Sequence, residues 1–292
     1  MQKLERRRFL QISALSLAGA AAGSAVSWFT PPAGAHLGVQ LWSVRDDMNK
    51  APLESVKALA KMGYREVEGF GYDNGKMFGM PFTDFIKMLG DNGIKMSSSH
   101  VMITAGDLVG GALSDKAKMA IDAAAKAGQR YVVCPYMIDP DRERIADMVK
   151  VYTAAAEYSQ KAGVRFGYHN HDFEYTKKGP DGRLLIEWLL HEIDPKMMAM
   201  EMDIYWVRYA NHNPLDWFRL YPGRWELCHA KDMANSEKRE SIEVGDGVID
   251  FRTIFNQSAQ AGLKYYIVEL EHYKTTPLEG VGKALTGLKK TI

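Results

Sequence analysis

The chain has 292 residues, of which 46% are hydrophobic and 25% are charged, and its formal net charge is +1 at pH 7. That length supports one large folded core, and a single domain of barrel size fits it. The near-neutral charge argues against nucleic acid or an anionic membrane surface as a partner.

The first 35 residues resemble an export signal of the twin-arginine type. The stretch ERRRFLQ at 5–11 is followed by an apolar, Ala/Gly-rich run at 12–28, and Ala33-Gly34-Ala35 offers an A-x-A cleavage site. We expect cleavage before His36, export to the periplasm, and no stable membrane span in the mature protein. The alternative is an uncleaved N-terminal anchor.

From residue 36 onward, short β-like runs alternate with longer helical runs. The predicted strands are 36–44, 64–70, 94–100, 130–135, 164–171, 197–203, 225–231 and 264–271. The predicted helices are 52–62, 82–92, 114–127, 141–162, 184–192, 214–221, 251–261 and 278–289. Glycine ends several of these helices and a strand follows at once, which is typical of the αβ loops of a parallel sheet.

Eight such units predict an α/β fold, namely a single (β/α)8 TIM barrel over residues 36–292. The alternative is a doubly wound open sheet, but no glycine-rich phosphate loop follows the first predicted strand.

The chain has two cysteines, Cys134 and Cys228, and both lie in apolar strand-like runs. We expect buried thiols, with a disulfide as the alternative in an oxidising compartment.

Polar side chains gather at the ends of the last four predicted strands. They come in pairs two residues apart, so both members of a pair face the same side of a strand. The pairs are His169 and His171, Glu201 and Asp203, His229 and Lys231, and Glu269 and Glu271. Such groups are costly to bury unpaired, but imidazoles and carboxylates can surround a shared cation. The pattern predicts one divalent metal ion, with Mn, Zn, Co or Fe favoured over Ca.

These residues resemble a known family. The stretches Met-Asp-Ile-Tyr-Trp at 202–206, Cys-His-Ala-Lys-Asp at 228–232 and Ile-Val-Glu-Leu-Glu at 267–271 are similar to sugar phosphate isomerases/epimerases of the xylose isomerase-like barrel superfamily. The resemblance runs from His36 essentially to the end. It implies that Asp203, His229 and Glu269 bind the metal. Many relatives place a fourth ligand, a Glu, on strand five.

Here strand five carries His169, followed by Asn170-His171, which resembles the histidine-rich strand of the inosose dehydratase branch. We therefore expect His169 as the fourth metal ligand, with His171 or Glu174 as alternatives. A metal-bound imidazole is a poor base, because its lone pair is occupied. Two-base epimerisation is then in question, with Glu269 as the one metal-bound base.

The resemblance implies a divalent-metal-dependent sugar isomerase or epimerase that works through a metal-stabilised enediolate. The alternative is a lyase or hydrolase on keto-sugars or 3-keto-glycosides, and a non-catalytic periplasmic sugar-binding protein is least favoured. The expected catalytic residues are Glu269, His169 and Lys231, with Lys231 as an acid whose pKa burial near a metal would lower. The alternative role of Lys231 is an ion pair with Asp232 or Glu201. The expected sugar contacts are Trp42, Glu68, His100, His171 and Trp206. The partner is a small-molecule sugar, and a homo-oligomer is left open.

Overall fold

The computed structural model describes residues 35–292. The predicted export signal lies outside these residues, apart from Ala35. Within 35–292, no helix is both long enough and apolar enough to cross a membrane.

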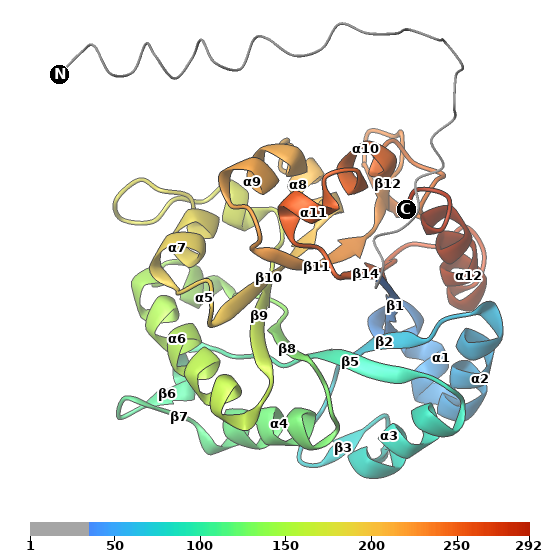
Figure 1. Cartoon of the computed structure of the whole chain (residues 1–292), viewed down its shortest axis with the longest axis horizontal. Coiled ribbons are helices and arrows are strands. Elements are labelled where there is room, and N and C mark those ends of the chain that lie inside the picture. The colour runs from blue at the N-terminus through green and yellow to red at the C-terminus, as the bar shows by residue number, and fades with distance from the viewer. Residues whose placement is uncertain (1–34) are drawn as a thin grey trace, which may run out of the picture.

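Eight parallel strands close into a barrel, in the order β1-β14-β11-β10-β9-β8-β5-β2. Figure 1 shows this ring of strands at the centre of the molecule, with the helices arranged around it. The barrel strands are β1 (His36–Gln40), β2 (Glu66–Gly69), β5 (Lys95–His100), β8 (Tyr131–Cys134), β9 (Arg165–His169), β10 (Met198–Asp203), β11 (Trp225–Ala230) and β14 (Tyr265–Val268). The predicted (β/α)8 fold is confirmed.

The helices differ from the prediction mainly by being divided. The segment predicted at 141–162 is α5 followed by α6, and the segment predicted at 251–261 is α10 followed by α11. The helices are α1 (Arg45–Lys50), α2 (Pro52–Met62), α3 (Phe82–Asp91), α4 (Asp115–Lys126), α5 (Asp139–Arg142), α6 (Ile145–Ala162), α7 (Leu185–Glu192), α8 (Ile204–Tyr209), α9 (Pro214–Leu220), α10 (Phe251–Phe255), α11 (Ser258–Ala261) and α12 (Pro277–Leu288). The short helices α1 and α8 were not predicted.

The first strand is shorter than predicted, because it ends at Gln40 and gives way to a 3-10 turn over Leu41–Val44. Three small two-stranded sheets lie in the loops: β3 (Lys76–Met77) with β4 (Met80–Pro81), β6 (Leu108–Val109) with β7 (Ala112–Leu113), and β12 (Asp232–Met233) with β13 (Ser241–Ile242).

Two of the predicted helix ends are clear in the backbone. Gly63 and Gly163 adopt φ of 103° and 88°, a left-handed conformation that lets the chain turn directly into the next strand.

The inside of the barrel is layered along its axis. Six apolar side chains form a cluster of their own, separate from the core between strands and helices: Tyr131, Val133, Ala199, Leu227, Tyr265 and Ile267. Two residues further along three of these strands, the inward positions become Glu201, His229 and Glu269. The apolar layer therefore closes the barrel beneath a polar layer. Cys134 and Cys228 are both buried and unpaired, so the expectation of buried thiols is confirmed.

The loop that follows β11 is held by one carboxylate. Asp232 accepts hydrogen bonds from the backbone N–H groups of Met233 (2.8 Å), Gly245 (2.9 Å), Gly247 (3.1 Å) and Ile249 (3.0 Å). The loop also packs closely against α12, where Gly287 lies against the carbonyl group of Val244. The close approach leaves no room for a side chain at position 287.

This packing predicts that alanine substitutions at two glycines of α12 differ in their effect on the free energy of unfolding. A Cβ at Gly287 would overlap the carbonyl oxygen of Val244, whereas the nearest atom to a Cβ at Gly282 is the flexible Met62 Sδ at 3.3 Å. Gly287→Ala should lower the free energy of unfolding by about 1–3 kcal/mol despite the better helix propensity of alanine. Gly282→Ala is the matched control and should change it by less than about 1 kcal/mol. Urea unfolding of both variants measures this, and equal midpoints would contradict the packing argument.

Candidate active site and metal centre

The four expected metal ligands come from adjacent strands at one end of the barrel. In the sheet register Glu201 lies opposite His169, and Asp203 lies opposite His229. Glu269 follows β14 directly, and its backbone N–H donates to the carbonyl of Ala230 at 3.3 Å, which extends the pairing with β11. Because parallel strands end at the same rim, these side chains meet at the mouth of the barrel.

His169, Asp203, His229 and Glu269 form what we call the outer cluster, in which one ligand atom from each lies within 4.8 Å of the others. His169 Nε2 is 3.5 Å from Asp203 Oδ2, and His229 Nδ1 is 3.1 Å from Glu269 Oε2 and 3.9 Å from Asp203 Oδ2. All four residues are buried. The geometry suits a metal ion bound by two imidazoles and two carboxylates.

Two atoms of the outer cluster have no hydrogen-bond partner among the described residues, namely His169 Nε2 and Asp203 Oδ2. The other ring nitrogen of His169, Nδ1, lies 3.0 Å from the carbonyl oxygen of Pro135, which can only accept a hydrogen bond. The proton therefore sits on Nδ1, and the lone pair of Nε2 points into the cluster. This lone pair lies 3.5 Å from Asp203 Oδ2, which Lys231 also contacts at 3.1 Å, and a cation between the ring and the carboxylate would satisfy it.

Lys231 is fully buried and contacts three carboxylates: Asp203 Oδ2 at 3.1 Å, Glu269 Oε2 at 2.7 Å and Glu271 Oε1 at 2.9 Å. Burial alone would lower the pKa of Lys231, as the sequence led us to expect, but the three carboxylates raise it well above its usual value. In this arrangement Lys231 is therefore a charged ammonium, and a lowered pKa beside a bound metal stays a prediction. The ion pairs expected as its alternative role are present, although the partners are not Asp232 and Glu201.

The carboxyl of Glu269 is held in its charged form. Burial would raise its pKa, but Lys231 and His229 hold it well below its usual range. His171 and Glu174, the two alternative ligands, are not part of the outer cluster. Burial raises the pKa of Glu174 to about 8, and its carboxyl accepts hydrogen bonds from Tyr168 Oη at 2.5 Å and from the backbone N–H of His171 at 2.8 Å. Glu174 thus fixes the turn after β9.

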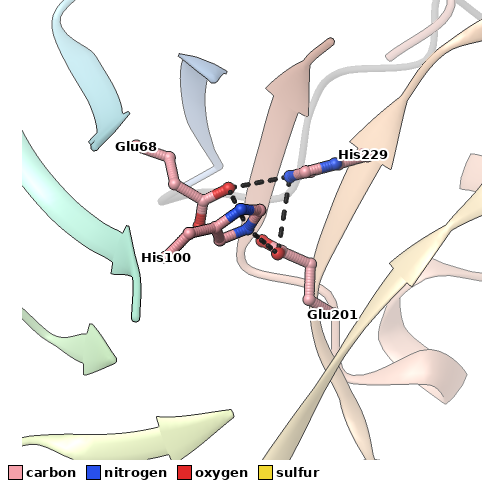
Figure 2. Close-up of side chains that lie close together, drawn as sticks. All are labelled: Glu68, His100, Glu201 and His229. Carbon is pink, nitrogen blue, oxygen red and sulfur yellow. Dashed lines mark hydrogen bonds and ion pairs between the residues drawn. The ribbon is translucent and has the colours of Figure 1, made fainter. Parts of the chain in front are cut away.

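Below the outer cluster lies a second group of residues, which we call the inner cluster: Glu68, His100, Glu201 and His229. Figure 2 shows the two carboxylates and the two imidazoles converging on one point inside the barrel. His100 Nε2 is 3.1 Å from both Glu68 Oε1 and Glu201 Oε2, and His229 Nε2 is 2.8 Å from Glu68 Oε1 and 3.4 Å from Glu201 Oε2. His229 therefore belongs to both clusters, through its two different ring nitrogens.

The inner cluster combines charges from opposite sides of the barrel. Burial would lower the pKa of His100, but Glu68 and Glu201 raise it to about 9. Burial and the neighbouring Glu68 raise the pKa of Glu201. Sequence reasoning saw Glu201 only as a strand-end carboxylate and missed this grouping. The one available signal was its position two residues before Asp203, on the same face of the strand.

A cavity of about 840 Å³ opens above the outer cluster. Among the expected site residues, Trp42, His100, His169, His171 and Glu269 line it, and so does Glu271, which we had not assigned a role. The remaining lining comes mainly from the loops after β2, β5 and β8 and from α4, including Phe70, Tyr72, Met102, Tyr136 and, on α4, Met119. The mixture of aromatic faces and a few converging polar groups is typical of a small-molecule site.

Two of the expected sugar contacts do not line this cavity. Glu68 has no exposed surface and accepts a hydrogen bond from Gln40 Nε2 at 2.8 Å in addition to its contact with His229. Trp206 packs its ring against His171, with centroids 5.4 Å apart, and lies 5.4 Å from Lys231 Nζ. These contacts favour supporting roles for both residues, and direct sugar binding by them stays a prediction.

Comparisons with known proteins agree with this fold. Residues 56–291 match the model of the xylose isomerase-like TIM barrel family. A sugar phosphate isomerase/epimerase from Parabacteroides distasonis ATCC 8503 is 27% identical, with a TM-score of 0.77 over 93% of this chain and 98% of that one. No curated protein matches the chain.

Two more distant structures share the fold. An L-ribulose 3-epimerase is 14% identical, with a TM-score of 0.65 over 87% of this chain and 93% of that one. The IOLI protein, solved with a bound zinc atom, is 16% identical, with a TM-score of 0.64 over 88% of this chain and 96% of that one. The family match covers most of the residues that the structure describes. The chain therefore belongs to the xylose isomerase-like TIM barrel family.

Proposed function

We propose that the protein is a divalent-metal-dependent sugar isomerase or epimerase, which moves a proton at a carbon beside a carbonyl group. The observation that carries the proposal is the outer cluster, in which His169 Nε2 has no hydrogen-bond partner among the described residues and faces Asp203 Oδ2 at 3.5 Å beneath a cavity of about 840 Å³. Similarity to a sugar phosphate isomerase/epimerase and to an L-ribulose 3-epimerase supports the reaction class. The zinc atom in the IOLI structure supports a metal.

His169, Asp203, His229 and Glu269 are the residues that would hold the ion. A divalent cation held there would supply a Lewis acid for the carbonyl oxygen of the substrate. Glu269 lines the cavity and is ionised, so it can accept the proton from the carbon beside the carbonyl. Lys231 neutralises Asp203 and Glu269 and holds both carboxylates in place through contacts of 3.1 and 2.7 Å.

A second candidate is a lyase or hydrolase that acts on keto-sugars or 3-keto-glycosides. Two observations favour it. Strand five offers His169 to the outer cluster where a second carboxylate base would be needed, and the cavity volume is in the range of about 300–1,000 Å³ that accommodates ligands larger than one sugar ring. The products separate the candidates, because isomerisation leaves the mass unchanged and elimination releases water or an aglycone. Mass spectrometry of reactions with free, 3-keto and glycosylated sugars decides between them.

The metal assignment predicts the effect of removing one ligand. His169→Ala and Asp203→Ala should each lose an ion that the wild-type protein retains after dialysis, because each ligand supplies a large share of the coordination energy. His212→Ala is the control, since His212 lies outside both clusters and contacts the carbonyl oxygen of Tyr175 at 3.0 Å. Elemental analysis of the three variants measures the metal content. Unchanged content in the first two variants would remove the outer cluster as the metal site.

The assignment of Glu269 as the base predicts a loss of turnover with retention of shape. Glu269→Gln should lower kcat by about 10²–10⁴-fold, and it should suppress deuterium uptake from heavy water at the carbon beside the carbonyl. Glu271→Gln makes the same chemical change at a carboxylate that also contacts Lys231, at 2.9 Å, outside the outer cluster. We expect a smaller loss there. Equal losses in both variants would instead identify two bases and favour epimerisation.

We also propose export of the protein through the twin-arginine motif within residues 1–35. Replacing Arg6 and Arg7 together with Lys should retain the precursor in the cytoplasm, because this route recognises the arginine pair. Cell fractionation and N-terminal sequencing report the outcome, and the mature chain should begin near His36. Export that continues unchanged in the double variant would exclude this route.

A further inference from the structure

We propose that the inner cluster binds a second divalent cation, behind the one proposed for the outer cluster. The proposal concerns a site that the sugar chemistry proposed above does not use. It is carried by the convergence of the four ligand atoms, by the unsatisfied oxygens of their carboxylates, and by the position of the cluster beside the cavity.

The four ligand atoms are arranged as around a common centre. The two imidazole nitrogens and the two carboxylate oxygens alternate, with N–O separations of 2.8, 3.1, 3.1 and 3.4 Å. An ion with bonds of about 2.0–2.2 Å sets its ligand atoms about 2.8–3.1 Å apart in an octahedron and about 3.3–3.6 Å apart in a tetrahedron. Three of the four observed separations match an octahedral ion, and the fourth, at 3.4 Å, is about 0.3 Å longer than the octahedral range. Figure 2 shows all four side chains directed at the same point.

Hydrogen bonds alone cannot satisfy all four of these N–O contacts. Each Nε2 atom can carry one hydrogen, yet His100 Nε2 and His229 Nε2 each lie close to both carboxylates. Two hydrogens must therefore serve four contacts. One cation at the centre satisfies all four atoms at once.

The carboxylates also keep oxygens that nothing satisfies. Glu68 Oε2 and Glu201 Oε1 are buried without a hydrogen-bond partner among residues 35–292. Both side chains have no exposed surface, so two negative charges lie inside the barrel opposite two imidazoles. A doubly charged cation would replace the protons that His100 and His229 hold against the two carboxylates, and the second oxygens allow either carboxylate to bind in a bidentate manner.

The surroundings of the inner cluster preorganise its ligands. Gln40 Nε2 donates to Glu68 Oε1 at 2.8 Å, and Gln40 Oε1 accepts from the backbone N–H of Trp42 at 3.0 Å, which orients the amide. A ligand held by such a supporting contact needs little rearrangement on binding an ion. His100 keeps a tenth of its side chain exposed and lines the cavity, so it marks the route by which an ion reaches the centre. The mixed imidazole and carboxylate set favours Zn, Mn, Fe or Co over Mg and Ca.

His229 would then connect the two ions. Its Nδ1 faces Glu269 at 3.1 Å in the outer cluster, and its Nε2 faces Glu68 at 2.8 Å in the inner cluster. With both clusters occupied, each ring nitrogen of His229 would be a ligand atom, and the ring would carry no N–H proton. The inner ion has no direct access to substrate, because Glu68, Glu201 and His229 have no exposed surface. It acts on the outer site through the shared ring.

The test is a zinc titration of metal-free protein with elemental analysis after dialysis. The wild-type chain should bind about two zinc ions, because each cluster supplies four ligands. Glu201→Gln keeps the size of the side chain but removes its charge, and it should bind about one. Glu174→Gln is the matched control, since Glu174 is an equally buried glutamate of the same rim that belongs to neither cluster. It should bind as many ions as the wild type.

Binding of one ion that Asp203→Ala loses and Glu201→Gln retains would overturn the inner site and leave the outer site intact. Binding of one ion that Glu201→Gln loses and Asp203→Ala retains would support the inner site and contradict the outer one. If Glu201→Gln does not fold, Glu68→Gln takes its place. Anomalous scattering from zinc-soaked wild-type crystals gives an independent measurement. A peak between the Nε2 atoms of His100 and His229 supports the proposal, and its absence at saturating zinc overturns it.

Discussion

The imidazole of His229 is the contact on which the polar interior depends. It is fully buried, and its two nitrogens lie 2.8 Å from Glu68 and 3.1 Å from Glu269, on opposite edges of the ring. Burial would lower the pKa of His229, but Glu201 and Glu269 raise it well above its usual value. Without this ring, only His100 would separate the buried carboxylates of Glu68 and Glu201, and Glu269 would keep only Lys231 as a positive partner, at a large electrostatic cost.

Lys231 compensates the buried carboxylates at the rim of the barrel in the same way. The outer cluster alone contains two carboxylates, and Glu271 brings a third close by. The buried ammonium lies within 3.1 Å of all three, and the rings of Tyr205 and Trp206 cover it at 5.5 and 5.4 Å. The aromatic rings keep water away from the ammonium, while the carboxylates keep it charged. This fixed positive charge keeps Glu269 ionised and in position. Lys231 can therefore support the site without transferring a proton.

The sequence predicted what depends on local pattern. Alternating β and helical runs gave the barrel, and the spacing of two residues between His229 and Lys231, and between Glu201 and Asp203, correctly placed both members of each pair on the inward face. The short helix α8 was missed because Asp203 caps it by accepting from the backbone N–H of Trp206 at 3.1 Å, and an aspartate at a strand end does not by itself indicate a helix cap. The short helix α1 and the division of two predicted helices were missed as well.

The inner cluster could not be predicted, because it depends on closure of the barrel. Glu68 and His100 stand on β2 and β5, while Glu201 and His229 stand on β10 and β11, and these two pairs of strands are not neighbours in the sheet. Only the curvature of the closed barrel brings Glu68 to 2.8 Å from His229 across the lumen. A sequence motif marks the rim of such a barrel, where each strand contributes separately. It does not mark contacts across the lumen.

The layering of the barrel also sets an order of access to the site. The apolar layer that contains Tyr131, Leu227 and Tyr265 closes the lumen below the inner cluster, and within the described residues the cavity at the rim is the approach to both clusters. His100 and His169 line that cavity, whereas Glu68 and Glu201 lie behind them without exposed surface. Any ion for the inner cluster must therefore pass the outer ligands before a substrate occupies the cavity. Loading of any such ions would therefore precede substrate binding, because the same opening serves both.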